Sequence, residues 1–332
     1  MLEQEFPGNN NFHCNNRLIS SSKLRIFYFT IFTTICNCSI FFAYDSVFIF
    51  NRYGITVPLA VFLIFFFNIS VMLRATFTDP GIIPRITKAE LNYLMNMYEV
   101  DTEDGMNRVG SHISIKNQIT KLKFCRTCKF FKPLRSNHCG ICNNCVEKFD
   151  HHCPWIGNCI GRRNHRYYLQ FLVSLGLLGS TIFAANITHI RLRRKETGDS
   201  LTRIALQMPL VFIESFISFL EMCAPSSLFT YHFYLLIQNK TTNEDMKGTY
   251  SRRSHLVNPF DSKSILKNIA RSICTSTYPS MIFYRKLKSP IVNSFRHNSE
   301  ISITNISNVS SETDSQVQSC TSEIQDIDCS DL

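Results

Sequence analysis

Charged residues are scarce in this sequence. Asp, Glu, Lys and Arg make up 18% of its 332 residues, whereas an average globular domain has about 25%. With 45% hydrophobic residues the chain is not disordered as a whole, and its length excludes a small disulfide scaffold. A mean hydropathy of −0.02 fits either a soluble domain or apolar segments offset by polar ones, so the distribution along the chain decides.

Charges are nearly absent from four apolar runs. Ile26–Phe50 contains one charge, Ile55–Leu73 and Tyr167–Thr188 contain none, and Ile204–Gln238 contains two acids. About 20 apolar residues span a bilayer as a helix, and buried core helices rarely stay uncharged for that length. The runs therefore predict four membrane spans rather than a soluble helical core. The first run begins 25 residues into the chain and is too long for a signal-peptide core.

The fourth run is too long for one straight pass. At about 1.5 Å per residue it would exceed roughly 50 Å, against about 30 Å of hydrocarbon. We expect one span kinked near Pro225 with one end outside the bilayer; two short spans are the alternative. Glu214 and Glu221 are then expected near an interface, where a buried charge costs less than at mid-bilayer.

The distribution of basic residues predicts the orientation. Residues 116–166 contain 11 Lys or Arg and two acids, and cytosolic loops carry an excess of basic residues. We therefore expect this loop in the cytosol, together with both termini, since the number of spans is even. The basic stretch Arg191–Lys195 after the third run would face the lumen, which conflicts with the rule; the larger signal decides the prediction.

We therefore predict a membrane α-helical fold class. It has four transmembrane helices and a cytosolic zinc-binding domain between helices 2 and 3. Residues 263–288 mix apolar with basic residues and fit either an anionic membrane surface or a solvated segment. The predicted segments are a cytosolic N-terminus (1–25), transmembrane helices 1 and 2 (26–77), a cytosolic cysteine-rich domain (78–166), helix 3 (167–190), helix 4 (204–238), a cytosolic C-terminal region (239–296) and an acidic disordered tail (297–332).

Seven of the 14 Cys fall within Cys125–Cys159, together with three His. Two-residue spacings between Cys, mixed with His, are typical of zinc ligands, and the reducing cytosol disfavours disulfides. Two zinc ions use eight of these ten candidates. The surplus Cys and His indicate either a thiolate nucleophile with its base, oriented by Asp150, or zinc knuckles with a spare Cys. Counting does not identify the spared residues.

The segment Asp150-His151-His152-Cys153-Pro154-Trp155 in this loop resembles the signature of the DHHC-type protein S-acyltransferases, or palmitoyltransferases. The resemblance runs from about residue 25 to 290 and leaves residues 1–20 and the tail outside. Further segments similar to family motifs are Cys159–Asn164, Thr78–Gly81, Thr241–Glu244 and Asn258–Phe260.

The resemblance implies two structural Zn²⁺ and a catalytic Cys153, with His151 as base and Asp150 orienting it. Thr242 and Glu244 would support this site, and Trp155 would lie at the membrane interface near the acyl chain. The implied zinc ligands are Cys125, Cys128, His138 and Cys145 for one ion, and Cys139, Cys142, His152 and Cys159 for the other.

The implied reaction is ping-pong transfer of a long-chain acyl group from palmitoyl-CoA to membrane-proximal cysteines of substrate proteins. The Phe-rich spans are expected to form a cavity for the acyl tail, and Arg162, Arg163 and Lys132 are candidates for the CoA phosphates. Residues 239–248 also resemble the subgroup that acylates Ras-type GTPases. That subgroup tends to work with a small accessory subunit on Golgi or endoplasmic reticulum membranes.

Three other functions fit less well. A non-catalytic membrane-anchored scaffold could use the zinc loop to bind partners. A nucleic-acid-binding zinc module would not need four spans, and the loop lacks a recognition-helix spacing, so we expect no nucleic acid partner. A transporter is disfavoured because ionisable residues are nearly absent from the middle of the spans.

Overall fold

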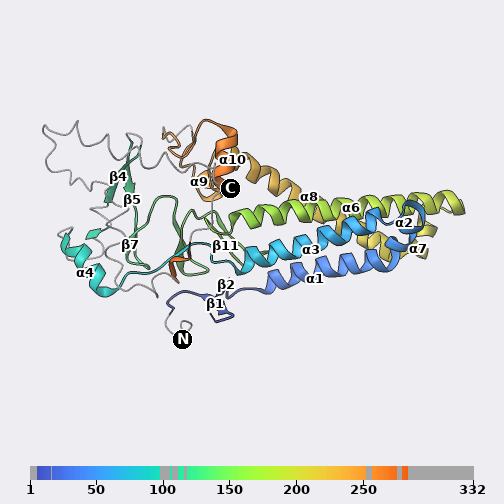
Figure 1. The fold of residues 1–332 in the computed structure, drawn as a ribbon, viewed down its shortest axis with the longest axis horizontal. Helices are drawn as coiled ribbons and strands as arrows, with labels where there is room; N and C mark the ends of the chain where they lie inside the picture. Colours follow the sequence, from blue (N-terminus) through green and yellow to red (C-terminus); the bar gives the residue numbers. More distant parts are fainter. Residues whose placement is uncertain are drawn as a thin grey trace.

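The computed structural model describes residues 6–15, 17–97, 105–106, 111–115, 118–251, 256–274 and 279–282. The described chain is elongated. A bundle of long helices forms one end, and short strands joined by loops form the other (Figure 1).

Within the described residues, four helical segments are long and apolar enough to cross a membrane, which confirms the predicted fold class. The first runs without interruption through α1 (Arg25–Ile40), the π-helical turn η1 (Phe41–Asp45) and α2 (Ser46–Tyr53). Gly54, at a φ of +75°, then turns the chain into the second segment. The other three are α3 (Thr56–Phe77), α6 (His165–Thr197) and α8 (Pro209–Ile237).

Two helix boundaries differ from those expected. Helix α6 continues to Thr197, so the basic stretch Arg191–Lys195 forms its last turns rather than a loop. The fourth run divides at Met208: α7 (Leu201–Gln207) ends there, and Pro209 begins α8, the first-turn position where proline is tolerated. Pro225 lies inside α8, which remains one helix rather than two short ones.

Helix α6 packs between α3 and α8 (Figure 1). Its contact with α8 depends on glycine: a Cβ on Gly179 would lie 2.6 Å from the Met222 nitrogen and 2.8 Å from the Ser218 oxygen, both in the α8 backbone. On the α3 side, the buried Asn68 amide donates to Ser174 Oγ at 2.8 Å. These contacts hold α6 between its neighbours, and the N-terminal part of α6 packs against Cys153.

Ionisable residues that are far apart in the sequence meet inside the bundle. His189 Nδ1 lies 2.7 Å from Asp45 Oδ1, at the end of the π-helical turn, and Asn37 donates to Glu221 at 2.7 Å. Glu214 is fully buried beside Asp45. Because these side chains come from α6, α8 and the first segment, runs of apolar residues did not indicate that they would meet.

The described part of the cysteine-rich domain between α3 and α6 contains short antiparallel strand pairs and the short helix α4 (Lys88–Met97). The strands described there have at most five residues, too few for a core of their own. The strands are β3 (Ile82–Ile83), β4 (Ser111–Ile115), β5 (Gln118–Leu122), β6 (Phe124–Cys125), β7 (Phe130–Phe131), β8 (Asn137–Cys139), β9 (Asn144–Val146), β10 (His151–Cys153) and β11 (Asn158–Ile160).

An N-terminal hairpin packs against this domain, although the family resemblance had left residues 1–20 outside. Its strands are β1 (Asn10–His13) and β2 (Leu18–Ser21). The Asn9 amide donates to the Cys142 carbonyl at 2.8 Å, and the Ser21 amide donates to the Gly157 carbonyl at 3.0 Å. Phe12 and Ile19 of the hairpin belong to the same apolar cluster as several of the cysteines.

Among the described residues of the C-terminal region are the short helices α9 (Thr242–Met246) and α10 (Ile265–Ile273). A turn follows Asn258, whose Oδ1 accepts from the Phe260 amide at 3.0 Å. Asn268 of α10 is buried and donates to the Ile237 carbonyl at the end of α8, at 2.8 Å. The predicted acidic tail lies outside the described residues.

Candidate active site and zinc centres

Strand alternation separates the zinc ligands into two groups. His138 and Cys139 are neighbours on β8, so their side chains point to opposite faces. His138 pairs with Cys145 across β8 and β9, and these two side chains belong to one group; Cys139 belongs to the other. In the same way His152 of β10 pairs directly with Cys159 of β11, and both belong to the second group.

The first group has the dimensions of a zinc site. The Nδ1 atom of His138 lies 3.6, 3.5 and 3.8 Å from the sulfurs of Cys125, Cys128 and Cys145. Tetrahedral zinc, with Zn–S near 2.3 Å and Zn–N near 2.0 Å, places sulfur and nitrogen about 3.5 Å apart. The Cys128 amide also points at the Cys125 sulfur, 3.5 Å away, as the turn of a Cys-x2-Cys pair requires.

The second group repeats this geometry. The Nδ1 atom of His152 lies 3.8, 3.5 and 3.6 Å from the sulfurs of Cys139, Cys142 and Cys159. Each group offers four ligand atoms within 4.8 Å of one another, and every cysteine in both groups is buried. The prediction of two zinc-binding Cys/His clusters is therefore confirmed.

His151 and Cys153 lie on the other face of β10 from His152, because alternate residues of a strand share a face. His151 Nδ1 donates to Asp150 Oδ2 at 2.7 Å, and Cys153 lies close enough to the ring to help raise its pKa. The Cys153 side chain is 4% exposed and belongs to an apolar cluster contributed by α1, α3 and α6. The residues spared by the zinc clusters thus meet where the domain joins the bundle.

Asp150 is held from two sides. Thr242 donates through its backbone amide to Oδ1 at 2.8 Å and through its hydroxyl to Oδ2 at 2.7 Å, the oxygen that also accepts from His151. Burial alone would raise the pKa of Asp150, but the hydrogen bond from His151 and nearby imidazoles hold it well below its usual range. Burial alone would lower the pKa of His151, but the contacts with Asp150 and Cys153 raise it to about 10.

Glu244 acts one step further away, through a residue that the sequence analysis missed. Both carboxylate oxygens of Glu244 accept from the Arg135 guanidinium at 2.8 Å, and one also accepts from the Thr241 amide, completing a capping box at α9. Arg135 also donates to the Asn239 carbonyl at 2.9 Å. A buried glutamate needs a cationic partner, and Arg135 meets that need for Glu244. The burial of Glu244 is seen only in the structure, so the sequence analysis did not select Arg135.

The remaining predicted residues occupy different surroundings. Trp155 is 51% exposed in the turn after Cys153. Arg162 pairs with Glu147, and Arg163 pairs with Asp79 at 3.1 Å, so each of the two arginines has a carboxylate partner within the chain. Lys132 lies close enough to Lys247 to influence its pKa.

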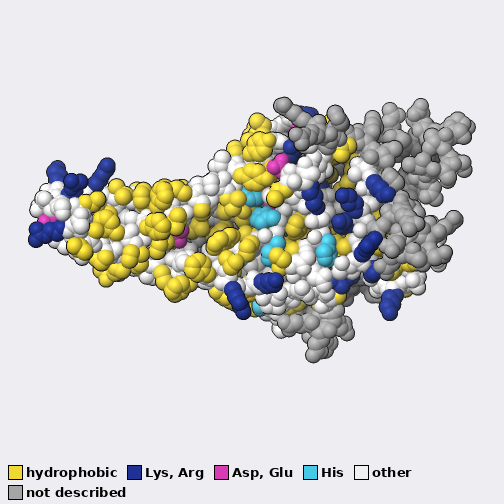
Figure 2. Space-filling view, turned by 180° about the vertical axis from the view of Figure 1, so that it is seen from behind, with side chains coloured by type: hydrophobic (Ala, Val, Ile, Leu, Met, Phe, Trp, Pro, Cys, Tyr) yellow, Lys and Arg dark blue, Asp and Glu magenta, His cyan; other side chains and the backbone are white. Residues whose placement is uncertain are grey.

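Three residues near Asp150 were not predicted. His232 of α8 places Nδ1 3.9 Å from Asp150 Oδ2, and its Nε2 is hydrogen-bonded to the Tyr168 hydroxyl at 3.1 Å. His165, the first residue of α6, lies close to the same carboxylate. Histidine surfaces gather where the bundle meets the loop domain (Figure 2).

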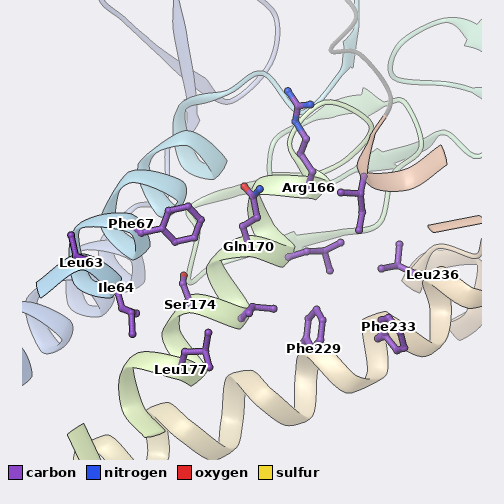
Figure 3. Close-up of a pocket in the computed structure, with 13 residues that line it drawn as sticks. Leu63, Ile64, Phe67, Arg166, Gln170, Ser174, Leu177, Phe229, Phe233 and Leu236 are labelled. Atoms are coloured by element: carbon purple, nitrogen blue, oxygen red, sulfur yellow. The ribbon is translucent and has the colours of Figure 1, made fainter. Parts of the chain in front are cut away.

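A cavity of about 510 Å³ lies between α3, α6 and α8, with Phe67 facing Phe229 and Phe233 across it (Figure 3). Its α6 residues include Gln170 and Leu177, whereas the Cys153 cluster uses the opposite face of α6: Tyr168, Phe171, Leu172 and Leu175. The cavity and the thiol thus lie on opposite faces of α6, although Phe229 borders both the cavity and the Cys153 cluster.

Comparison with known proteins agrees with this geometry. The family model described as DHHC palmitoyltransferase matches residues 118–249. The palmitoyltransferase ZDHHC9 of Danio rerio is 38% identical over 291 residues, covering 86% of this chain and 74% of that protein. The chain belongs to the DHHC palmitoyltransferase family. Human palmitoyltransferase ZDHHC18 is also 38% identical, over 83% of this chain and 72% of its own length, and human ZDHHC9 is 36% identical, over 84% and 78%.

As a DHHC palmitoyltransferase, the protein is an acyl-CoA-dependent S-acyltransferase rather than a non-catalytic scaffold. Its two Cys/His clusters are the zinc-binding clusters of the DHHC domain, and palmitoyl-CoA fits as the acyl donor.

Neighbouring histidines of β10 should behave differently when replaced. We expect His152→Ala to lose about one zinc ion per chain and to unfold the loop, since a structural zinc supplies roughly 10 kcal/mol of folding free energy. His151→Ala should keep both ions and lower acyl-enzyme formation by about 10²-fold or more. Zinc content of the purified variants, measured by atomic spectroscopy, checks this. Equal zinc content in the two variants would contradict the ligand assignment.

Proposed function

We propose that Cys153 is the nucleophile that carries the acyl group, that His151 is its base and that Asp150 orients His151. One observation carries this proposal: His151 lies 2.7 Å from the Asp150 carboxylate and shares a face of β10 with the Cys153 thiol, which helps to raise the pKa of the ring. A carboxylate, an imidazole and a thiol in this order generate a thiolate at neutral pH, where a free Cys with a pKa near 8.5 is mostly protonated.

The reaction then has two balanced halves. The Cys153 thiol gives its proton to His151, and the thiolate attacks the carbonyl carbon of the acyl-CoA thioester. The bond from that carbon to the CoA sulfur breaks, and the departing CoA thiolate takes the proton from His151. In the second half a substrate thiol gives its proton to His151, and its thiolate attacks the acyl-enzyme. The bond from the acyl carbon to the Cys153 sulfur breaks, and the released Cys153 thiolate takes the proton back from His151. One thioester replaces another, so acyl-CoA is the only energy source.

Thr242 and Glu244 support this centre as positioning residues. Two hydrogen bonds from Thr242 fix both oxygens of Asp150, so the carboxylate cannot rotate away from His151. Glu244 holds Arg135, and the Arg135 carbonyl accepts from the Phe149 amide at 2.9 Å, directly before Asp150. Through these contacts the C-terminal region holds the loop that carries the proposed reacting groups in position.

The acyl chain and the CoA phosphates of the acyl-CoA substrate are proposed to lie in different parts of the protein. The acyl chain is proposed to lie along the apolar cluster around Cys153, which includes Phe27, Met72 and Phe171, with Trp155 at the membrane interface. For the CoA phosphates, Lys132 is the best supported candidate. Burial lowers the pKa of the Lys247 ammonium, and Lys132 and Lys123 lower it further, so an anionic ligand would relieve the repulsion among the three. Arg162 and Arg163 would need to leave their present carboxylate partners.

Replacing Cys153 tests the chemistry. Incubated with labelled palmitoyl-CoA in detergent, the wild-type protein should take up about one hydroxylamine-labile label per chain, and Cys153→Ser should take up none. The double variant Cys14→Ser/Cys274→Ser, which removes two exposed cysteines, is the control and should label like wild type. Undiminished labelling of Cys153→Ser would refute the assignment.

We further propose that both termini and the DHHC domain face the cytosol, in Golgi or endoplasmic reticulum membranes. The excess of basic residues in 116–166 supports this orientation, and the four candidate spans return the chain to its starting side. The basic last turns of α6 would then be lumenal, beside Glu196, which pairs with Arg52.

Glycosylation mapping tests the topology. An acceptor site inserted at the turn around Gly198, between α6 and α7, should be glycosylated in cells, whereas acceptors placed before residue 6 or after residue 282 should not. Resistance of the attached glycan to endoglycosidase H indicates passage to the Golgi, and sensitivity indicates residence in the endoplasmic reticulum. Glycosylation at either terminus would reverse the proposed orientation.

For the substrates, we propose Ras-type GTPases with membrane-proximal cysteines, acylated together with a small accessory subunit. The resemblance of residues 239–248 to the Ras-acylating subgroup supports this.

A single-turnover assay tests the substrate class. The acyl-enzyme should transfer its label to a lipidated Ras C-terminal peptide at least about 10-fold faster than to the same peptide with its acceptor Cys replaced by Ser. Co-expression with the accessory subunit should raise the yield of acyl-enzyme. Transfer to unrelated membrane-proximal cysteines at the same rate would reject a Ras-type preference.

A further inference from the structure

A third group of metal-ligand side chains adjoins the catalytic centre. Ligand atoms of Asp150, His165 and His232 lie within 4.8 Å of one another. None of the three belongs to either Cys/His cluster, and they come from three elements: the start of β10, the first turn of α6 and the last turns of α8. Two imidazoles and one carboxylate form a ligand set that binds divalent transition metals and leaves positions open for water.

Two further observations point to a ligand. The Nδ1 atom of His165 is buried and has no hydrogen-bond partner among the described residues, a costly state for a ring nitrogen. His232 turns Nδ1 toward Asp150 Oδ2, 3.9 Å away, while its Nε2 is hydrogen-bonded to the Tyr168 hydroxyl. A histidine that binds a metal through one nitrogen typically donates from the other to such a second partner, which fixes its tautomer.

We propose that Asp150, His165 and His232 form a site for a third divalent transition-metal ion, Zn²⁺, which inhibits acyl transfer when it binds. The ligand atoms must move from the observed spacing to roughly 3.3 Å, the edge of a zinc tetrahedron with N and O ligands. Small rotations of the three side chains suffice, since His165 is only half-buried at the end of its helix. With three protein ligands and this rearrangement, the site should bind Zn²⁺ more weakly than either Cys₃His cluster.

Inhibition follows from the atom that the metal would use. Asp150 Oδ2 already accepts from His151 at 2.7 Å and from the Thr242 hydroxyl at 2.7 Å. An ion bound between Oδ2 and the two histidines takes electron density from that oxygen, which Thr242 keeps in place, and thereby weakens its hydrogen bond with His151. The imidazole is then a weaker base for Cys153, because the carboxylate beside it carries less negative charge. This inhibitory role rests on the catalytic roles proposed above, but the metal site itself does not.

Counting zinc tests the site without any activity. The full-length protein in detergent, freed of loosely bound metal with a weak chelator, should hold two ions and take up a third at micromolar Zn²⁺. His165→Phe should keep the two and fail to take up the third. His13→Phe, which alters a histidine of the N-terminal hairpin, should take it up like wild type. A third equivalent bound by His165→Phe as tightly as by wild type would overturn the proposal.

The competing explanation is that added Zn²⁺ binds the thiol of Cys153 with His151. Cys153→Ser separates the two, because it should retain the third ion if Asp150, His165 and His232 hold it. Co²⁺ added in place of Zn²⁺ should bind without a thiolate-to-cobalt charge-transfer band. Loss of the third ion in Cys153→Ser, or appearance of that band, would contradict the site.

Autoacylation completes the test. Zn²⁺ should inhibit wild-type acyl-enzyme formation reversibly, and His165→Phe should need at least 10-fold more Zn²⁺ for half-inhibition, each compared with its own uninhibited rate. If both proteins are inhibited at the same Zn²⁺ concentration, the third ion is not the inhibitor.

Discussion

Zinc coordination is the constraint on which the catalytic half of the molecule depends. The segment between α3 and α6 has strands of two to five residues, which cannot bury enough apolar surface to hold themselves together. Its buried cysteines instead converge on His138 and His152 with the spacing of tetrahedral zinc. Binding free energy of the metal therefore replaces a hydrophobic core, and the geometry of the reacting groups follows from it.

The alternation of a strand converts that constraint into chemistry. Because His152 must point at a metal, the residues on either side of it must point away, and these are His151 and Cys153. Pairing of His152 with Cys159 fixes the register of β10 and β11. A shift of one residue would exchange the proposed base for a zinc ligand. The ligand bond that stabilises the loop therefore also places the proposed base and the proposed nucleophile on the strand face away from the metal.

The features predicted from the sequence were those that depend on residues close together in the chain. Cys and His spacings identified the zinc clusters, and uncharged runs identified the four spans. The features missed depend on contacts between distant segments. Arg135 meets Glu244 more than 100 residues later, and the N-terminal hairpin reaches the Cys142 carbonyl. The end of α6 was missed for another reason: its last turns are basic, and composition alone cannot distinguish a polar helix end from a loop.

Asp150 links the zinc-binding loop to the membrane helices, because its carboxylate accepts hydrogen bonds from both parts of the chain. The carboxylate lies at the end of the zinc domain, yet Thr242 after α8 holds both of its oxygens. His232 from α8 and His165 from α6 approach it from the bundle. The contact of α6 with α8 at Gly179 leaves no free space, and α6 also packs against Cys153 through Tyr168 and Phe171. The bundle therefore surrounds both the carboxylate that is proposed to orient His151 and the proposed nucleophile.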